Sequence, residues 1–151
     1  MEEIMDSIRV IGRDNARTPM QWDESKNAGF STGQPWLAVN PNYQSINVQE
    51  VLANQDSIFY TYQKLVQIRK ENSWLIQADF ELLETTDKVF AYIRKDGGRR
   101  FLVVANLSNE EQDLTVEGNV KSVLIENTTV QGVFEKQILA PWDAFCVELT
   151  D

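Results

Sequence analysis

Residues 89–105 read VFAYIRKDGGRRFLVVA, and they indicate how the second half of the chain folds. Two runs rich in β-branched and aromatic residues, Val89–Ile93 and Phe101–Ala105, flank the tripeptide Asp96-Gly97-Gly98. Such runs favour strands, and adjacent glycines accept the positive φ angles that a tight hairpin turn requires. The stretch therefore predicts an antiparallel β-hairpin.

Similar short segments lie on both sides of this hairpin. They are Phe80–Glu84, Asp113–Val116, Ser122–Ile125 and Ala144–Leu149. Short strands at this number and spacing favour a sandwich or Greek-key arrangement over a sheet built from βαβ units. We therefore expect an antiparallel β-sandwich. The one cysteine, Cys146, lies in the last segment and is expected to be a buried strand residue.

An amphipathic helix is predicted upstream of these strands, over residues 57–70. Its apolar stripe consists of Ile58, Phe59, Tyr62, Leu65, Val66 and Ile68. Asp56 or Ser57 is a candidate N-cap, and Asn72 is suited to end the helix. A shorter helix-compatible run occupies residues 48–54. The longer helix needs a partner surface for its stripe.

Residues 13–46 have no sustained periodicity and contain three of the four prolines in the chain. Loops longer than about 15 residues are uncommon in compact domains and are often functional. This long loop is therefore the first place to search for a site.

The chain carries 23 acidic and 14 basic residues, for a formal net charge of −9. We expect no nucleic-acid partner and no membrane partner, because nucleic acids and anionic membranes both demand clustered positive charge. No apolar run approaches the roughly 20 residues of a transmembrane helix, and no signal peptide is recognisable. A cytoplasmic location is expected.

The absence of histidine excludes Ser-His-Asp and Cys-His catalysis and removes the commonest metal ligand. No phosphate-binding glycine motif occurs, so we expect neither a metal nor a cofactor. The acidic residues near or within the long loop are Asp6, Asp14, Asp23 and Glu24. A retaining glycosidase needs two carboxyl groups about 5–5.5 Å apart, and the sequence places no pair at that distance. None of these residues is assigned a catalytic role.

Several consecutive motifs resemble one known family. They are Arg13–Asp23 (RDNARTPMQWD), Asn27–Gly33 (NAGFSTG), Val39–Tyr43 (VNPNY), Leu65–Lys70 (LVQIRK) and, more weakly, Ala140–Phe145 (APWDAF). Together they resemble the α-1,6-active branch of glycoside hydrolase family 13, which includes oligo-1,6-glucosidase, dextran glucosidase and trehalose-6-phosphate hydrolase. The resemblance covers nearly the whole chain and is strongest up to Lys70.

The resemblance implies an α+β chain with two parts. Residues 1–72 are expected to be the C-terminal remnant of a catalytic (β/α)8 barrel, with the long loop at the active-site rim and the closing helices after it. Residues 73–151 are expected to be the antiparallel β-sandwich domain. The family's catalytic carboxylates belong to earlier barrel motifs that do not occur here. We therefore expect no catalytic residue in this chain, no activity from the chain alone, the missing barrel as its partner, and an uncovered stripe on the helix over 57–70.

Arg17 is the one residue to which the resemblance gives a substrate-binding role. The equivalent arginine of such enzymes pairs with an aspartate of the missing part and helps hold the hydroxyls of the non-reducing-end glucose, a task that suits a planar guanidinium. The alternative is a salt bridge that only pins the loop, and Arg13 and Asp14 are interpreted as structural. The tryptophans are interpreted as packing residues rather than sugar platforms: Trp22, Trp36, Trp74 and Trp142.

The favoured function is that of an α-glucosidase of the dextran glucosidase type. Such an enzyme hydrolyses α-1,6-glucosidic bonds at the non-reducing end of isomalto-oligosaccharides or dextran by a retaining double displacement. Two alternatives stay open: a fragment of trehalose-6-phosphate hydrolase, and a stand-alone carbohydrate-binding or interaction module. Only the stand-alone module predicts an exposed aromatic platform and measurable affinity of the isolated chain for isomaltotriose.

Overall fold

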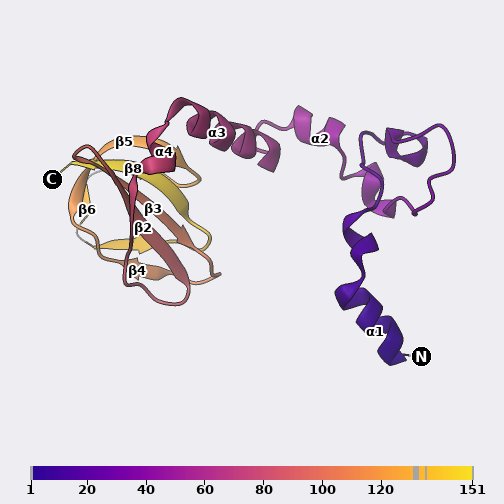
Figure 1. Ribbon diagram of the computed structural model, residues 1–151, viewed down its shortest axis with the longest axis horizontal. Helices are drawn as coiled ribbons and strands as arrows, with labels where there is room; N and C mark the ends of the chain where they lie inside the picture. Colours follow the sequence, from indigo (N-terminus) through magenta and orange to yellow (C-terminus); the bar gives the residue numbers. More distant parts are fainter. Residues whose placement is uncertain (1, 131–132, 135, 151) are drawn as a thin grey trace. The chain divides into compact units, whose positions relative to one another are not determined.

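The computed structural model describes residues 2–130, 133–134 and 136–150. Met1 and Asp151, which begin and end the two expected domains, lie outside the described residues. The chain divides into two compact units, Met1–Tyr62 and Gln63–Asp151 (Figure 1). None of the described helices combines the length and the apolar character that a membrane span requires.

The first unit consists of short helices and a long ordered loop. Its elements are α1 (Glu2–Ile11), the 3-10 helices η1 (Arg13–Ala16), η2 (Lys26–Gly29) and η3 (Pro41–Gln44), and α2 (Val48–Ala53). The helix expected over 48–54 is thus confirmed as α2. Asn47 caps it, because the Asn47 side-chain oxygen accepts a hydrogen bond from the Glu50 amide at 2.9 Å.

Helix α3 (Ile58–Glu71) begins in the first unit and continues into the second. It begins and ends one residue later than the helix predicted over residues 57–70. The Ser57 hydroxyl donates to the Val51 carbonyl oxygen at 2.7 Å. At the other end, the side-chain amide of Asn72 donates to the Ile68 carbonyl oxygen at 2.8 Å, so Asn72 ends the helix as expected. No residue of α3 is buried, and the exposed fraction of Ile58 reaches 84%. The stripe is uncovered, as predicted.

The second unit is a short helix followed by strands. Its elements are α4 (Trp74–Gln77), β1 (Asp79–Leu82), β2 (Val89–Asp96), β3 (Arg99–Asn106), β4 (Gln112–Leu114), β5 (Gly118–Glu126), β6 (Val133–Phe134), β7 (Gln137–Leu139) and β8 (Ala144–Thr150). All the described strand pairs are antiparallel, in a six-stranded sheet of order β1-β2-β3-β8-β5-β6 and a two-stranded sheet of β4 and β7. Every predicted strand is present. Strands β6 and β7 were not predicted, because each is too short to show an alternating pattern.

The predicted hairpin joins β2 to β3. Asp96 pairs with Arg99, so Gly97 and Gly98 form the two-residue turn. Their φ angles are +54° and +86°, and no heavy atom lies within 4 Å of where a β-carbon would sit on either residue. The backbone conformation, rather than crowding, is therefore what requires glycine at both positions.

The main core lies between the two sheets. It consists of Val89, Ala91, Ile93, Leu102, Val104, Leu114, Val116, Leu139, Phe145, Val147 and Leu149. On β8 the core residues Phe145, Val147 and Leu149 alternate with residues on the opposite face, as strand geometry dictates. Because the six-stranded and two-stranded sheets share this core, the unit is the antiparallel sandwich that the strand pattern predicted.

The face of the six-stranded sheet turned away from this core is called the outer face below. Trp74 of α4 stacks on Phe101 there, with ring centroids 3.7 Å apart and planes inclined by 10°. The Trp74 indole N–H donates to the Asn72 side-chain oxygen at 2.9 Å, and Arg94 donates to the carbonyl oxygens of Leu75 and Ala78. These contacts fix α4 on the sheet.

A buried carboxylate lies on the same face. Glu148 of β8 accepts hydrogen bonds from Arg99 at 3.0 Å, Lys121 at 2.9 Å and Ser122 at 3.3 Å. The bonds from Arg99 and then Lys121 lower the pKa of Glu148 to about 2, against a smaller opposing effect of burial. Three donors thus compensate the cost of burying this charge.

One expectation is confirmed in part and one needs correction. Trp74 packs as predicted. Trp22, Trp36 and Trp142 are 50%, 87% and 59% exposed, so for them packing between the barrel and the β domain, the other form of the expectation, stays a prediction. Cys146 lies on β8 as predicted but is only partly buried, because it alternates onto the outer face. Its surroundings still raise the pKa of the thiol to about 11 by desolvation.

Candidate functional site

Arg17 follows two short turns that come directly after α1. The Gly12 amide donates to the Ile8 carbonyl oxygen at 2.8 Å, and a β-carbon on Gly12 would lie 2.3 Å from that oxygen. Only glycine fits this turn without a shift of the backbone. The η1 turn comes next and closes with the Arg17 amide donating to the Asp14 carbonyl oxygen at 3.0 Å.

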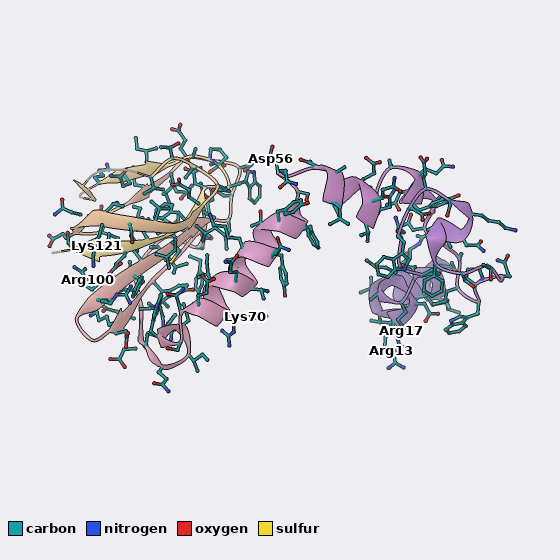
Figure 2. The ribbon with its side chains drawn as sticks, turned by 90° about the horizontal axis from the view of Figure 1, so that it is seen from above. Arg13, Arg17, Asp56, Lys70, Arg100 and Lys121 are labelled. Atoms are coloured by element: carbon teal, nitrogen blue, oxygen red, sulfur yellow. The ribbon has the colours of Figure 1, made fainter. Side chains whose placement is uncertain are left out.

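The Arg17 side chain is exposed and has no ion-pair or hydrogen-bond partner among the described residues. Arg13, from the same turn, is exposed as well (Figure 2). Two residues beyond Arg17, Pro19 is buried and anchors the backbone. Among the described residues no carboxylate forms a salt bridge with Arg17 that would hold the loop in place. The five N–H donors of the Arg17 guanidinium are therefore available to other groups.

Two side-chain amides stabilise the long loop: Gln21 joins residues that are far apart in the sequence, and Asn47 forms a local bond at the end of the loop. Gln21 donates to the side-chain oxygen of Asn42 at 3.0 Å and also to the Ile46 carbonyl oxygen. Asn47 is buried and donates to the Tyr43 carbonyl oxygen at 2.9 Å. Sequence reasoning missed both roles. The position of Asn47 directly before a helix-compatible run is a capping signal that could have revealed part of them, whereas Gln21 carries no local signal.

Residues 27–29 form a left-handed turn. Their φ angles are +57° at Asn27, +58° at Ala28 and +66° at Gly29. Left-handed backbone costs a non-glycine residue about 1–2 kcal/mol, so two residues here hold an unfavourable conformation. Ala28 is nevertheless fully buried, and its carbonyl oxygen accepts from the Trp22 amide at 2.8 Å. Backbone strain of this kind is typical of functional loops.

Asp23 is a structural acceptor within this loop. Its carboxylate accepts from the Ser25 amide at 2.8 Å, and hydrogen bonds from the Ser25 side chain and then its backbone lower the pKa of Asp23. The carboxylate also fills the space where a β-carbon on Gly29 would lie, at 2.6 Å. Elsewhere Asp6 forms an ion pair with Arg9 at 3.0 Å. The described residues contain no cluster of three or more acidic or cysteine side chains that could hold a metal ion.

The geometry therefore provides a rim that carries the exposed guanidinium groups of Arg13 and Arg17, neither of which has a side-chain partner among the described residues. Large apolar side chains of the same loop are also about half exposed or more: Met20, Trp22, Phe30 and Trp36. A planar cation on such a rim can hold a carboxylate and sugar hydroxyls, but the rim itself supplies no pair of carboxylates arranged for bond cleavage.

Comparisons with known proteins place both halves of the chain. Residues 1–78 match the family described as alpha amylase, catalytic domain, and residues 80–145 match the family described as maltogenic amylase, C-terminal domain. Over 149 residues the chain is 89% identical to a glucan 1,6-alpha-glucosidase of Streptococcus pneumoniae serotype 4, covering 99% of this chain and 28% of that protein.

More distant matches show the same pattern of coverage. The chain is 34% identical to a trehalose-6-phosphate hydrolase of Bacillus subtilis, over 99% of this chain and 28% of the relative. Among solved structures, a trehalulose synthase from Pseudomonas mesoacidophila superposes with a TM-score of 0.90 at 34% identity, over 99% of this chain and 28% of that one. The chain thus spans a little over a quarter of the length of these proteins.

Proposed function

This chain belongs to the alpha-amylase catalytic-domain family, and on that premise we propose that it supplies one edge of the sugar site of an α-1,6-glucosidase. The complete enzyme hydrolyses α-1,6-glucosidic bonds at the non-reducing end of isomalto-oligosaccharides or dextran. The observation that carries the proposal is the 89% identity to a glucan 1,6-alpha-glucosidase over 149 residues, which include the Arg17 rim.

Arg17 is the substrate-binding residue in this proposal. One edge of its guanidinium donates to a carboxylate of the rest of the catalytic domain, and another edge donates to the hydroxyls of the terminal glucose. Hydrogen bonds within the long loop hold the backbone around Arg17 in place. Little further ordering of the loop is therefore required when sugar binds.

The bond-breaking carboxylates come from the remainder of the enzyme. Retaining hydrolysis needs a nucleophile and an acid–base residue about 5–5.5 Å apart, and we assign neither to this chain. The chain alone is therefore inactive. The chain binds the oligosaccharide only when it is part of the complete enzyme. The complete enzyme acts in the cytoplasm, and cell fractionation followed by immunoblotting tests this location.

The domain boundary belongs to the proposal as well. Residues 1–72 complete the catalytic barrel and residues 73–151 form the C-terminal domain, with Asn72 directly after the closing helix α3. The Asn72 cap on α3 supports this division. The family matches, 1–78 and 80–145, place the change of family slightly later in the chain.

Trehalose-6-phosphate hydrolase is the weaker alternative. The identity to the Bacillus subtilis enzyme is 34%, against 89% for the glucan 1,6-alpha-glucosidase. A phosphorylated substrate also calls for converging cationic groups, whereas each basic residue of η1 and η2 is a separate exposed side chain.

The test compares the isolated chain with a complete polypeptide, in which the upstream portion of the Streptococcus pneumoniae relative is joined to residues 1–151. We expect the complete polypeptide to hydrolyse isomaltotriose and the isolated chain neither to hydrolyse it nor to bind it in calorimetry. Binding by the isolated chain would instead identify a stand-alone carbohydrate module. Hydrolysis of trehalose 6-phosphate in preference to isomaltotriose would support the phosphate-specific alternative.

A further inference from the structure

Trp142 lies in a strained turn between β7 and β8. Its φ angle is +64°, in the left-handed region that favours glycine. Pro141 precedes it, and the Asp143 amide donates to the Ala140 carbonyl oxygen at 3.2 Å. This is the pattern of a type II turn, whose third residue is usually glycine or asparagine. A bulky aromatic residue at that position is an outlier, so the turn carries a conformational cost that glycine would avoid.

Neighbouring loops hold this turn in place. The Asn127 side-chain amide donates to the Trp142 carbonyl oxygen at 2.8 Å, and the Trp142 amide donates to the Ser108 carbonyl oxygen at 3.2 Å. Asn106, which is only 2% exposed, donates to the Ala140 carbonyl oxygen at 2.9 Å. Strained backbone persists where its surroundings fix it, and such positions cluster at functional sites.

The hydrogen bonds of Trp142 use its main chain and not its side chain. The indole is 59% exposed, and its N–H has no hydrogen-bond partner among the described residues. Glycine would supply the same amide and carbonyl groups without the strain, so tryptophan contributes only its ring. The turn therefore presents a flat aromatic face and an N–H donor on a fixed backbone.

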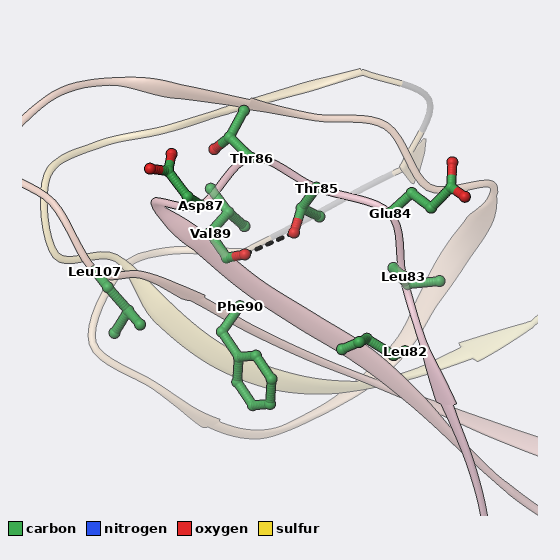
Figure 3. A pocket seen from close by; sticks show the side chains of 9 residues that line it. All are labelled: Leu82, Leu83, Glu84, Thr85, Thr86, Asp87, Val89, Phe90 and Leu107. Atoms are coloured by element: carbon green, nitrogen blue, oxygen red, sulfur yellow. Dashed lines mark hydrogen bonds between the residues drawn. The ribbon is translucent and has the colours of Figure 1, made fainter.

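The surroundings of this turn suit an uncharged ligand. Leu107, which directly precedes the residue that accepts from the Trp142 amide, borders a hollow of about 650 Å³ (Figure 3). The Glu84 and Asp87 carboxylates line that hollow, and no basic residue does. Lys88 is already engaged in an ion pair. An anionic ligand thus finds no free cation here, whereas a neutral ligand rich in hydroxyl groups meets no repulsion.

We propose that Trp142 is the platform of a surface site on the second unit for a neutral α-glucan chain. One glucose ring stacks on the indole, and the indole N–H donates to a hydroxyl oxygen of the same chain. Dextran is the glucan expected here, a choice that rests on the proposed function. The chain is not thereby a stand-alone module, because residues 1–78 match a catalytic domain.

A site with one aromatic platform binds weakly, because it contacts a single sugar ring. Isomaltotriose therefore leaves it mostly empty in calorimetry, whereas dextran offers a very high local concentration of glucose units. In the complete enzyme, a dextran chain held at Trp142 has its ends confined near the enzyme, which raises their effective concentration. The site thus serves long substrates and not short ones.

The first test is electrophoresis of the isolated chain in native gels with and without dextran. Dextran should slow the wild-type chain by about twofold, and Trp142→Leu should lose most of this retardation. Ile138→Ser, at 67% exposure on β7, is the matched control and should be retarded like wild type. A wild-type chain that dextran does not slow, or equal retardation of Trp142→Leu, would overturn the proposal.

Trp142→Gly separates binding from stability, because it removes the ring and the strain together. The unfolding midpoint of this variant should equal or exceed that of wild type, while its retardation by dextran is lost. A lower midpoint would show that the ring serves the fold of the sandwich, which would overturn the proposal.

The complete polypeptide distinguishes sugar binding from the packing role expected of Trp142. Hydroxyl-radical modification of Trp142 should be equal in the isolated chain and the complete polypeptide, and should fall severalfold when dextran is added. Protection in the complete polypeptide without sugar would overturn the proposal in favour of packing.

Kinetics of the complete polypeptide give a further readout. Trp142→Leu should raise the KM for dextran severalfold and leave kcat/KM for isomaltotriose unchanged. An unchanged KM for dextran, or an equal loss with isomaltotriose, would contradict a site for long chains. Failure of the glucosidase proposal is separable, because the isolated chain would then be slowed by dextran although the complete polypeptide does not cleave isomaltotriose.

Discussion

At Gly29 two physical constraints act on a single backbone position. Its φ of +66° lies in the left-handed region that favours glycine, and the Asp23 carboxylate occupies the place of a β-carbon. Gly29→Ala should cost at least about 1–2 kcal/mol locally, which corresponds to roughly five- to thirtyfold faster hydrogen exchange of the Trp22 amide that is bonded to Ala28. Gly33→Ala is the matched control, because the nearest atom would lie 3.7 Å away. Equal exchange in the two variants would refute the account of this turn.

The Glu148 carboxylate gives the sandwich a defined dependence on pH. Its folded pKa of about 2 lies below the ordinary 4.5, so its stabilisation is fully present above pH 4.5 and is lost as the pH falls towards 2. Arg99 and Lys121 are about half exposed, and solvent screening reduces the contribution to about 1–2 kcal/mol. Glu148→Gln should lower the unfolding free energy at pH 7 and flatten its dependence on pH between 4.5 and 2.

Denaturant unfolding at a series of pH values, followed by tryptophan fluorescence, measures this effect. Glu84→Gln is the control, since Glu84 is exposed and should leave the pH profile unchanged. A Glu148→Gln profile that runs parallel to that of wild type would mean that the carboxylate makes no net contribution to stability.

At the scale of elements, Trp74 fastens α4 to the sheet. It combines a stacked contact with Phe101 and a hydrogen bond to Asn72. Trp74→Leu removes both, and should destabilise the second unit by about 2–4 kcal/mol. Trp142→Leu, at 59% exposure, should change the unfolding free energy by less than about 0.5 kcal/mol. Chemical denaturation of both variants measures these unfolding free energies. Similar losses of unfolding free energy in the two variants would contradict the role given to α4.

Some of the helices and strands could be predicted from the sequence, and some of the contacts between them could not. The hairpin, the longer strands and α3 follow from local composition, because glycine turns, β-branched runs and helical spacing each carry their own signal. The cover of Phe101 by Trp74 does not, since it depends on which strands become neighbours. The partial exposure of Cys146 likewise follows from the register of β8, and an alternating face is not visible in a run as apolar as AFCVEL.

The candidate site was predictable only in part. Arg17 was singled out through the motif around it, and its role as a substrate-binding residue stays a prediction. The loop geometry that holds it was not foreseen: the left-handed turn at Asn27 and Ala28 uses residues with no strong preference for it, and Gln21 acts across a long separation in sequence. Contacts of that kind leave no periodic trace in a single sequence.

At the scale of the whole molecule, the described part of the chain has exposed apolar side chains on both of its units. Ile58 and Tyr62 on α3 lie in the first unit, and Phe80 and Leu82 on β1 lie in the second. Large exposed apolar surfaces drive association, so the isolated chain should self-associate as its concentration rises, and the complete polypeptide should not. Sedimentation velocity over a range of concentrations tests this, and a strictly monomeric chain would contradict the view that these surfaces require a cover.

The most direct test of the central claim is the kcat/KM of the complete polypeptide for isomaltotriose after substitution of Arg17. Arg17→Ala should lower kcat/KM by about 10- to 100-fold, the loss expected when charge-assisted hydrogen bonds to the substrate are removed. Lys26→Ala, an exposed cation of the same loop, should leave it unchanged. If Arg17→Ala is as active as Lys26→Ala, this loop does not form an edge of the sugar site.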